Sequence, residues 1–425
     1  MAALIETVKP IVRWGLDRPL RTTVVLTCVS IACLWLVFQP SFFQTETNFA
    51  ALAPDYEPQV RSLLAGNGFG SFRYPPVFPL IQAGLEVASQ ATGVDDGHLG
   101  ALLLLVSAVS GSVLIFLLGN RIWGPRWGLF CVAVWLAYPV FWRLWLQPLS
   151  EAPFVVLLLG AFLLLLGSAV PGDVGHRRLL LTGLGLGLAM LTRPSGIGLP
   201  LVFGIYLLVG ERGWSFRRRL SSAALLLVGS LVAILPWEIH AYRSTGEIIP
   251  VSTEGVEAVL DGLTYAVDPS EDRPVWVPEN VRHLQWEIHE RSYRELSSIS
   301  SIAAYLLANH LERPAAVIQL YAIKVARAWY GTDSGVLDRW LLLFQIPIVT
   351  LLWVGVFKSW RYGGAPRDAG VLITMIVLYF WAITTAALSI VRYMVPALAA
   401  MVLLMPGIWT HLRLRGVRAN QIGYG

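Results

Sequence analysis

Long apolar stretches separated by short polar segments dominate the hydropathy pattern of the chain. Runs such as 101–118, 154–166 and 371–388 contain no Asp, Glu, Lys or Arg. Several approach the roughly 20 residues that a helix needs to cross the hydrocarbon core of a bilayer. The pattern therefore predicts about ten transmembrane helices, near 21–39, 100–118, 128–145, 152–170, 179–193, 194–210, 220–237, 339–357, 369–388 and 394–411.

The charge distribution predicts how these spans are oriented. The two short spans that meet at Arg193 and Pro194 are either a tight hairpin or one broken helix. The hairpin, with a cytoplasmic N-terminus, gives the cytoplasmic segments 18 basic and five acidic residues, and leaves a net negative charge outside. Because basic residues are retained on the cytoplasmic side, this distribution favours the hairpin and places both termini in the cytoplasm.

Composition excludes a soluble protein. Hydrophobic residues make up 56% of the chain and charged residues only 14%, whereas soluble domains carry about 25% charged residues. We therefore expect an all-α polytopic protein, integral to the cell membrane. The net charge of +5 fits cytoplasmic retention and contact with membrane lipids, so it does not indicate nucleic-acid binding. All three cysteines fall inside predicted spans and say little about redox compartment.

Two segments outside the predicted membrane are long enough to carry chemistry. A first extracytoplasmic loop, about 40–99, belongs to a transmembrane core over 1–237, and a second loop region, 238–338, is expected to be partly helical. The C-terminal helices and a cytoplasmic tail complete the chain over 339–425. Within the first loop, prolines and apolar periodicity predict two amphipathic helices, which suit the plane of the membrane surface.

Five stretches together resemble the GT-C glycosyltransferases, the membrane enzymes that include protein O-mannosyltransferases and aminoarabinose transferases of lipid A. They occur in the order of that family and cover most of the chain. They read APDYEPQVRSLLAGNGFGSFRYPPVFPLIQA at 53–83, LSEAPFVVLLL at 149–159, GLGLAMLTRPSG at 185–196, PWEIHAYRSTGEIIPVSTEG at 236–255 and VRYMVPAL at 391–398.

The resemblance implies a reaction. A hexosyl or pentosyl group is expected to move from a polyprenyl-phosphate-linked sugar to a hydroxyl of a lipid, glycan or protein acceptor, on the non-cytoplasmic face and with inversion at the anomeric carbon. Such chemistry needs a carboxylate that takes the acceptor proton and cations that stabilise the leaving phosphate.

Asp55 and Glu151 are the candidate catalytic residues. Asp55 stands at the acidic position of the family pattern, just before the first amphipathic helix; alternatively it is a solvated loop acid near the positive end of that helix. Glu57 is the fallback base. Glu151 lies at the mouth of a span, where a carboxylate is costly, so it either orients an acceptor or metal or belongs to the helix start, capped by Ser150.

Outer-face basic residues are the candidates for donor binding. Arg73, Arg193 and Arg392 lie on the outer face against the retention bias, and guanidinium groups can bind phosphate bidentately. Alternatively they anchor helix ends, and Arg193 seals the hairpin by pairing with Glu151. The full candidate set also includes Tyr74 and Tyr393 beside two of these arginines, and His240 and Arg243 at another helix mouth.

Other function classes find less support. No cofactor is predicted: the seven histidines form no HxxxH or HExxH pair, so ligand spacing does not support a metal site, although a divalent cation stays open. A secondary transporter is a rival hypothesis, but the chain lacks the internal repeat that transporters commonly carry. A non-catalytic membrane scaffold is the second rival.

Overall fold

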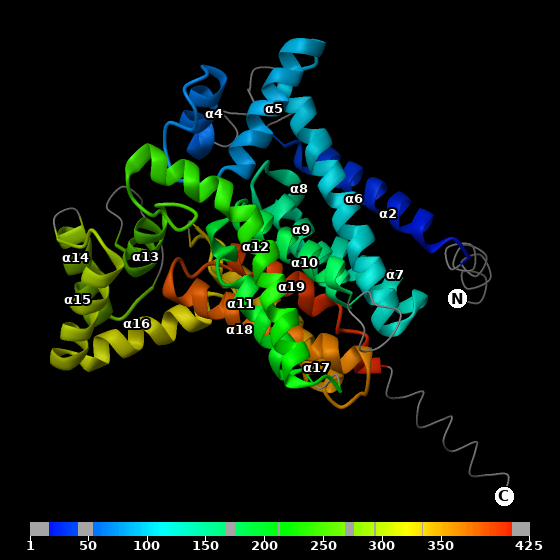
Figure 1. Cartoon of the computed structure of the whole chain (residues 1–425). Helices are drawn as coiled ribbons and strands as arrows, with labels where there is room; N and C mark the ends of the chain where they lie inside the picture. The colour runs from blue at the N-terminus through cyan, green and yellow to red at the C-terminus, as the bar shows by residue number, and fades with distance from the viewer. Residues whose placement is uncertain are drawn as a thin grey trace, which may run out of the picture.

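The protein is an all-α polytopic membrane protein. The computed structural model describes residues 17–40, 54–166, 175–210, 213–267, 276–292, 295–333 and 335–409, and these contain no β-strand. Parts of the predicted loops and the predicted tail from 410 onward lie outside the described residues. Long apolar helices form a tilted bundle, with shorter helices at one of its ends (Figure 1).

The ten predicted spans fall on eleven helices of the bundle, because the span predicted at 128–145 is divided between α7 and α8. These helices are α2 (Pro19–Phe38), α6 (Asp96–Trp123), α7 (Pro125–Ala137), α8 (Pro139–Leu146), α9 (Glu151–Leu166), α10 (His176–Met190), α11 (Leu199–Val209), α12 (Phe216–Thr245), α17 (Asp338–Ser359), α18 (Ala365–Ala386) and α19 (Val391–Val402). By length and composition, five described helices can cross a membrane alone, or six if α7 and α8 are one span bent by 71°. The count of ten crossings stays a prediction.

Proline and glycine set several helix boundaries. The bend between α7 and α8 lies at Pro139, which lacks the N–H that would continue the backbone ladder. The side chain of Asp95 caps α6 by accepting a hydrogen bond from the N–H of Gly97 at 2.9 Å. The helix α12 ends at Gly246, whose φ of +74° is readily adopted by glycine.

The helices α10 and α12 pack closely through glycines. Gly183 of α10 lies against Leu226 and Ser230 of α12, and Gly187, one turn later, lies against Ser230 and Ala233. A Cβ at Gly183 would come within 2.0 Å of the Leu226 carbonyl oxygen, so only glycine fits. Residue numbers rise together along both helices, which are therefore parallel. The chain must reverse between them, and the predicted hairpin at Arg193 and Pro194 is confirmed.

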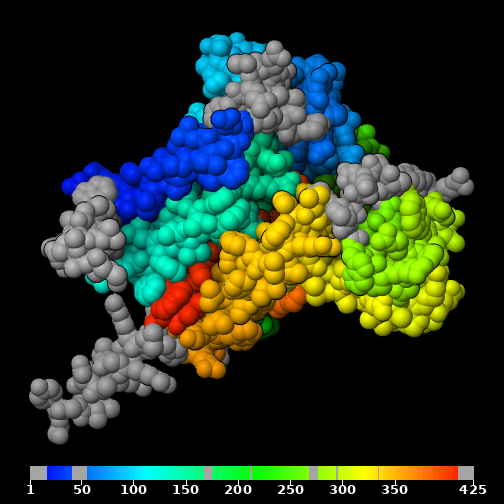
Figure 2. Space-filling model, turned by 180° about the vertical axis from the view of Figure 1, so that it is seen from behind, coloured from blue at the N-terminus to red at the C-terminus, as the bar shows by residue number. Residues whose placement is uncertain are grey.

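Lipid-facing surface explains the exposed apolar side chains. Most of the apolar surface of α2 and α17 is not covered by protein, and both helices lie along the outside of the bundle in Figure 2. The bundle interior is a continuous apolar core to which α6, α9, α18 and α19 contribute most. Glycines and alanines let these helices approach, as is usual where lipid supplies no hydrophobic driving force.

The short helices form two groups at the same end of the bundle. The first loop provides η2 (Pro54–Tyr56), α4 (Glu57–Leu64) and α5 (Val77–Thr92), and the second provides α13 (Gly255–Thr264), α14 (Glu279–Ser292), α15 (Ile299–Glu312) and α16 (Pro314–Arg327). The α13–α16 unit has its own apolar core and stands out as a yellow-green lobe in Figure 2. In α4, Glu57 is the first helical residue and Tyr56 is the cap residue.

Aromatic rings and backbone hydrogen bonds hold the two groups together. Phe69 and Phe72 of the first loop pack against Trp237 of α12, with ring centroids 4.9 and 5.2 Å apart. The Trp237 indole N–H donates to the Val251 carbonyl oxygen at 2.8 Å, and the Thr253 N–H donates to the Phe72 carbonyl oxygen at 2.9 Å. The first loop is thereby fixed over the segment that leads into α13.

Candidate functional site

A cavity of about 330 Å³ lies between the two groups of short helices and the bundle. The first loop contributes one wall, the segment leading into α13 contributes another, and the ends of bundle helices form the floor. The polar and charged side chains that line it are those of Asp55, Tyr56, Tyr74, Ser150, Arg193, Ser195, Ser252, Glu254, Arg392 and Tyr393. Five of the nine predicted site residues, from three of the five stretches quoted above, therefore meet in one cavity.

An arginine–glutamate–arginine cluster forms the floor. The Glu151 carboxylate is buried, with 4% of the residue exposed. One of its oxygens, Oε1, forms an ion pair with Arg193 Nη1 at 2.7 Å and accepts a hydrogen bond from Arg392 Nε. With one carboxylate between two guanidinium groups, the cluster carries a net charge of about +1.

Three helix ends bring this cluster together. Glu151 is the first residue of α9, where the positive end of the helix dipole favours a carboxylate. Arg193 follows the end of α10 in an extended conformation, which the following Pro194 favours. Arg392 lies in the first turn of α19, where a cation is disfavoured by the dipole, so the Glu151 carboxylate compensates for that position.

Hydroxyl groups extend the cluster toward the first loop. Arg193 Nη1 donates to Ser150 Oγ at 3.1 Å, and Ser150 Oγ is also 3.0 Å from the Tyr56 hydroxyl. Burial raises the pKa of Tyr56 to about 12, so this hydroxyl keeps its proton at neutral pH. The Arg193 guanidinium lies over the Tyr393 ring at 5.3 Å, which fixes its orientation further.

Two carboxylates face the cavity above this floor. Asp55 is exposed within η2, and Glu254 is the residue just before α13. Burial raises the pKa of the Glu254 carboxyl above its usual range, and Asp55 raises it further, whereas the positive charges of Arg193, Arg73 and Arg392 act in the opposite direction. A carboxylate with a raised pKa is a better proton acceptor near neutral pH.

The site thus separates two kinds of charge. Guanidinium groups lie on the bundle side, where they can stabilise an anion, and carboxylates lie on the loop side, where they can accept a proton. This division is what a displacement at carbon needs when the leaving group is a phosphate.

The other predicted donor ligands lie outside the cavity lining. Arg73 pairs with Glu257 at 2.5 Å, and its guanidinium lies over the Tyr74 ring at 5.5 Å. His240 packs against Phe69 and Phe72, with ring centroids 5.7 and 5.8 Å away.

Arg243 is exposed in the last turn of α12. His240 thus packs against the first loop, and neither residue lines the cavity.

Glu254, Ser150 and Tyr56 are cavity residues that the sequence reasoning did not select. Glu254 stands in the quoted stretch 236–255, but nothing in its neighbours marks it among the acids of the second loop. Ser150 was considered only as a helix cap, whereas its hydroxyl oxygen lies within hydrogen-bonding distance of Arg193 and Tyr56. Within the described part of the chain, no group of three or more His, Cys, Asp or Glu side chains could hold a metal ion.

A family model provides the first comparison. Residues 74–240 match the family described as dolichyl-phosphate-mannose-protein mannosyltransferase. This region runs from Tyr74, at the edge of the cavity, to the end of α12, and it contains Glu151 and Arg193. No curated protein matches the chain in a sequence comparison.

Solved structures provide the second comparison. The archaeal oligosaccharyltransferase AglB from Archaeoglobus fulgidus, in complex with an inhibitory peptide and a dolichol-phosphate, is 12% identical, with 97% of this chain and 53% of that chain covered and a TM-score of 0.57. The apo form of the Archaeoglobus fulgidus oligosaccharyltransferase gives 12% identity, 95% and 52% coverage and a TM-score of 0.58. ArnT from Cupriavidus metallidurans, bound to undecaprenyl phosphate, gives 16% identity, 90% and 77% coverage and a TM-score of 0.44.

The chain thus spans about half the length of the archaeal oligosaccharyltransferase whose fold it shares. The shared fold covers nearly all of this chain, including both loop regions that enclose the cavity. Together, the fold and the family match confirm the resemblance to GT-C membrane glycosyltransferases that the sequence motifs predict.

Proposed function

We propose that the protein transfers a sugar from a polyprenyl-phosphate-linked donor to an acceptor hydroxyl on the non-cytoplasmic face of the membrane. The observation that carries this proposal is the single cavity in which Arg193 and Arg392, held by Glu151, face the carboxylates of Asp55 and Glu254. The matched family is described by a dolichyl-phosphate-mannose donor, and AglB was solved with a dolichol-phosphate, which supports this donor class.

The two floor arginines would bind the donor phosphate. A guanidinium group forms paired hydrogen bonds with phosphate oxygens, and its charge stabilises the phosphate as the bond to the sugar breaks. Glu151 shares its carboxylate between both arginines, so its part is to orient them. This assigns Glu151 a positioning role, different from the acceptor- or metal-orienting role that its sequence position suggests.

Asp55 would be the base that takes the acceptor proton. Glu254 would be a second carboxylate that binds the acceptor. The acceptor oxygen attacks the anomeric carbon while its proton passes to the carboxylate, and the bond between that carbon and the phosphate oxygen breaks. Attack from the side opposite the phosphate inverts the anomeric carbon. The transferred sugar would be a hexose or a pentose, and assays with the two kinds of donor distinguish them.

The test is transfer by the purified protein in nanodiscs, without an ion gradient, using a panel of polyprenyl-phosphate-linked hexoses and pentoses with membrane lipids, glycans and peptides as acceptors. The expected result is release of polyprenyl phosphate together with a glycosylated product. If the protein instead moves labelled donor across the membrane of sealed proteoliposomes without such release, it is a transporter. If neither occurs, it is a scaffold, and the proposal fails.

Substitutions of the two carboxylates test the assignment of the base. Asp55→Asn should lower turnover by about 10²–10⁴-fold, the usual effect of losing an acid–base group. Glu254→Gln should have a smaller effect, and Glu247→Gln, an exposed acid at the same face, should have none. The reverse order of the first two would assign the base to Glu254, whose raised pKa would then give a rate that rises with pH through that value. Full activity in both variants would overturn the mechanism.

A further inference from the structure

The lobe formed by α13–α16 has two outer surfaces of different character. On α14, the exposed side chains are mostly charged or polar, and they include those of Glu279, Arg282, His283, Glu290 and Arg291. On α15 and α16, by contrast, the segments 296–311 and 314–323 contain no Asp, Glu, Lys or Arg. Water therefore suits the surface of α14, and an apolar medium suits that of α15 and α16.

An apolar stripe runs along the outer side of both helices. Leu307 and Leu311, one turn apart in α15, are 62% and 77% exposed, and Ile318 in α16 is 58% exposed. At 100° per residue, the buried Ile302 and Leu320 lie on the opposite sides of their helices, toward the core of the lobe. A contiguous exposed surface of this kind marks a place where a protein contacts another protein or a membrane.

A contact with α18 places the end of α16 at the level of the membrane. The Trp381 indole N–H donates to the Val325 carbonyl oxygen at 2.9 Å. Trp381 precedes Ala386, the last residue of α18, by five residues, or about 7.5 Å at the helical rise of 1.5 Å per residue. Since α18 is long and apolar enough to cross a membrane alone, α16 ends alongside a span and not above it.

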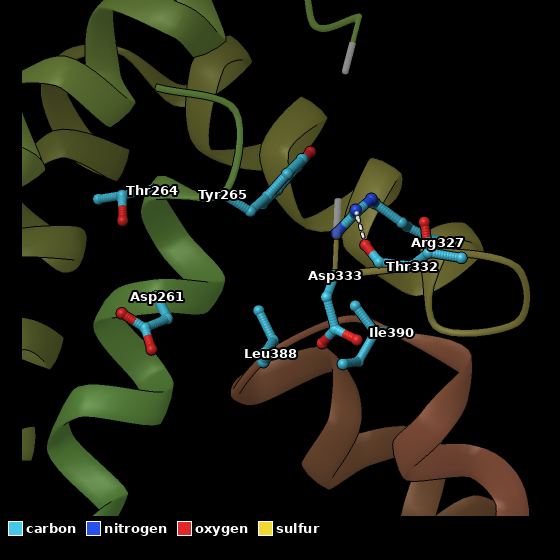
Figure 3. A pocket seen from close by; sticks show the side chains of 8 residues that line it. All are labelled: Asp261, Thr264, Tyr265, Arg327, Thr332, Asp333, Leu388 and Ile390. Atoms are coloured by element: carbon cyan, nitrogen blue, oxygen red, sulfur yellow. Dashed lines mark hydrogen bonds between the residues drawn. The ribbon is translucent and has the colours of Figure 1, made fainter. Parts of the chain in front are cut away.

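Arg327 fixes this end of α16 to the bundle. Its Nη2 donates to the Thr332 carbonyl oxygen at 2.8 Å, shown as a dashed line in Figure 3, and its Nε donates to Asp338, the first residue of α17, at 3.2 Å. The guanidinium also lies over the ring of Tyr265, just after α13, at 4.5 Å. One side chain thus joins the lobe to the start of a span, so the depth of the lobe relative to the bundle is fixed.

The stripe extends sideways from a lipid-facing surface. From its junction with the bundle beside α18, α16 forms the lower edge of the lobe in Figure 1. Its 14 residues extend about 21 Å. At the start of α17, Trp340 and Leu343 are 73% and 66% exposed, and a tryptophan is typical of the membrane–water interface. Lipid that covers α17 would therefore meet the stripe on α15 and α16 at the same depth.

The charges at the turn between α15 and α16 fit this arrangement. Nη1 and Nη2 of Arg313 donate to the two carboxylate oxygens of Glu287 in α14, at 2.9 and 2.7 Å. The guanidinium is therefore held toward the charged side of the lobe, away from the stripe. Glu312 is exposed at the same turn, where the hydrated headgroup layer can solvate its carboxylate.

We propose that α15 and α16 lie in the surface of the bilayer and that phospholipid, in the leaflet at this end of the bundle, covers their apolar stripe. Amphipathic helices of this kind sink about 5–10 Å into the boundary between headgroups and acyl chains. The lobe also carries Glu254, just before α13, so lipid contact would hold this wall of the first cavity at the membrane surface. The inference concerns membrane contact and does not depend on the proposed reaction.

Nitroxide accessibility in nanodiscs provides the test. The full chain without native cysteines is labelled at single sites created by Leu307→Cys, Leu311→Cys and Ile318→Cys. The control for lipid is Leu343→Cys in α17, and the control for water is His283→Cys in α14, whose side chain is 71% exposed. Power saturation compares collision with oxygen, which concentrates in lipid, and with a nickel chelate, which stays in water. The three stripe labels should favour oxygen, as Leu343 does, at a depth of about 5–10 Å below the phosphates.

Each other outcome would overturn the proposal. Stripe labels that favour the nickel chelate, as the label at His283 should, would place the stripe in water. Low accessibility to both reagents would show that protein covers the stripe, and spin–spin broadening that requires two chains in one nanodisc would identify a second copy as the occupant. All five labelled positions are exposed, so the thermal unfolding midpoint should stay that of the unlabelled chain and exclude a change of fold.

Discussion

Lys324 offers a test of the packing between α13 and the segment before α19. This residue of α16 is fully buried, and its Nζ donates to the carbonyl oxygens of Gly262 at 2.6 Å and Ala387 at 2.7 Å. It thus joins α13 to the segment before α19. A Cβ at Gly262 would come within 1.8 Å of the Ala387 carbonyl oxygen, so the two backbones are in close contact at this point.

The protonation of Lys324 should make stability depend on pH. Burial lowers the pKa of Lys324 to about 7, and the nearby Arg327 charge lowers it further, from an ordinary value of 10.5. A neutral amine has two N–H groups, which match the two carbonyl acceptors. Between pH 7 and 10.5 the unfolded chain binds more protons than the folded one, so the free energy of unfolding rises with pH across this window. Since one pKa unit is worth about 1.36 kcal/mol, the gain is on the order of 5 kcal/mol.

Lys324→Met removes both the titration and the two hydrogen bonds. The variant leaves two buried carbonyl groups without this donor, at a cost of about 1–3 kcal/mol each. At pH 6 that loss is offset because the wild type carries a buried ammonium, whereas at pH 10 it is not. The unfolding midpoint of the variant should therefore fall increasingly below that of the wild type as the pH rises.

The assay is thermal unfolding in detergent, followed by tryptophan fluorescence from pH 6 to 10. Other groups titrate alike in both proteins, so the difference between their midpoints is the measured quantity. Lys358→Met is the matched control, since the half-buried Lys358 donates to one carbonyl, that of Ile408, at 3.1 Å. A difference between wild type and Lys324→Met that stays constant, or shrinks as the pH rises, would refute the reasoning.

Three further predictions concern the floor cluster and the topology. Glu151→Gln should lower the free energy of unfolding by about 3–5 kcal/mol, because two largely buried guanidinium groups lose their shared partner; an unchanged unfolding midpoint would show that Glu151 does not hold the arginines. Arg392→Ala should raise the donor KM and lower turnover, Arg392→Lys should do so only partly, and Arg73→Ala should have little effect; unchanged steady-state kinetics in Arg392→Ala would contradict phosphate binding there. In a cysteine-free background, Glu279→Cys should react with a membrane-impermeant reagent in intact cells and Arg217→Cys should not, and the opposite pattern would place the cavity on the cytoplasmic side.

The helices could be predicted because their causes are local. Apolar runs of nearly membrane length, with proline at their starts and glycine at their ends, define most of them. The hairpin at Arg193 followed from charge retention alone. The pairing of Glu151 with Arg193 could also be predicted from the sequence. An arginine on the outer face and a carboxylate at the end of a span each need a partner of opposite charge. That Arg392 shares the same carboxylate depends on α19 packing against α9, and no local pattern encodes that contact.

The second loop was less predictable for a similar reason. Lys324 lies on an amphipathic helix, where a lysine ordinarily faces water, and only the packing of α16 against α13 and α18 buries it. Glu254 enters the site because the first loop is fixed over the segment before α13. His240 and Arg243 share one helix mouth in the sequence, but at 100° per residue Arg243 points to a different side of α12 from Trp237.

The order in which the chain is made gives the floor cluster a further property. Glu151 and Arg193 are 42 residues apart and can pair as soon as α9 and α10 are inserted. That pair is neutral. Arg392 follows Glu151 by 241 residues, so the surplus positive charge is added only when the last bundle helix arrives. In a nascent or truncated chain, the floor cluster would therefore have little attraction for a lipid phosphate, and the charge that binds it would appear only when α19 joins the bundle.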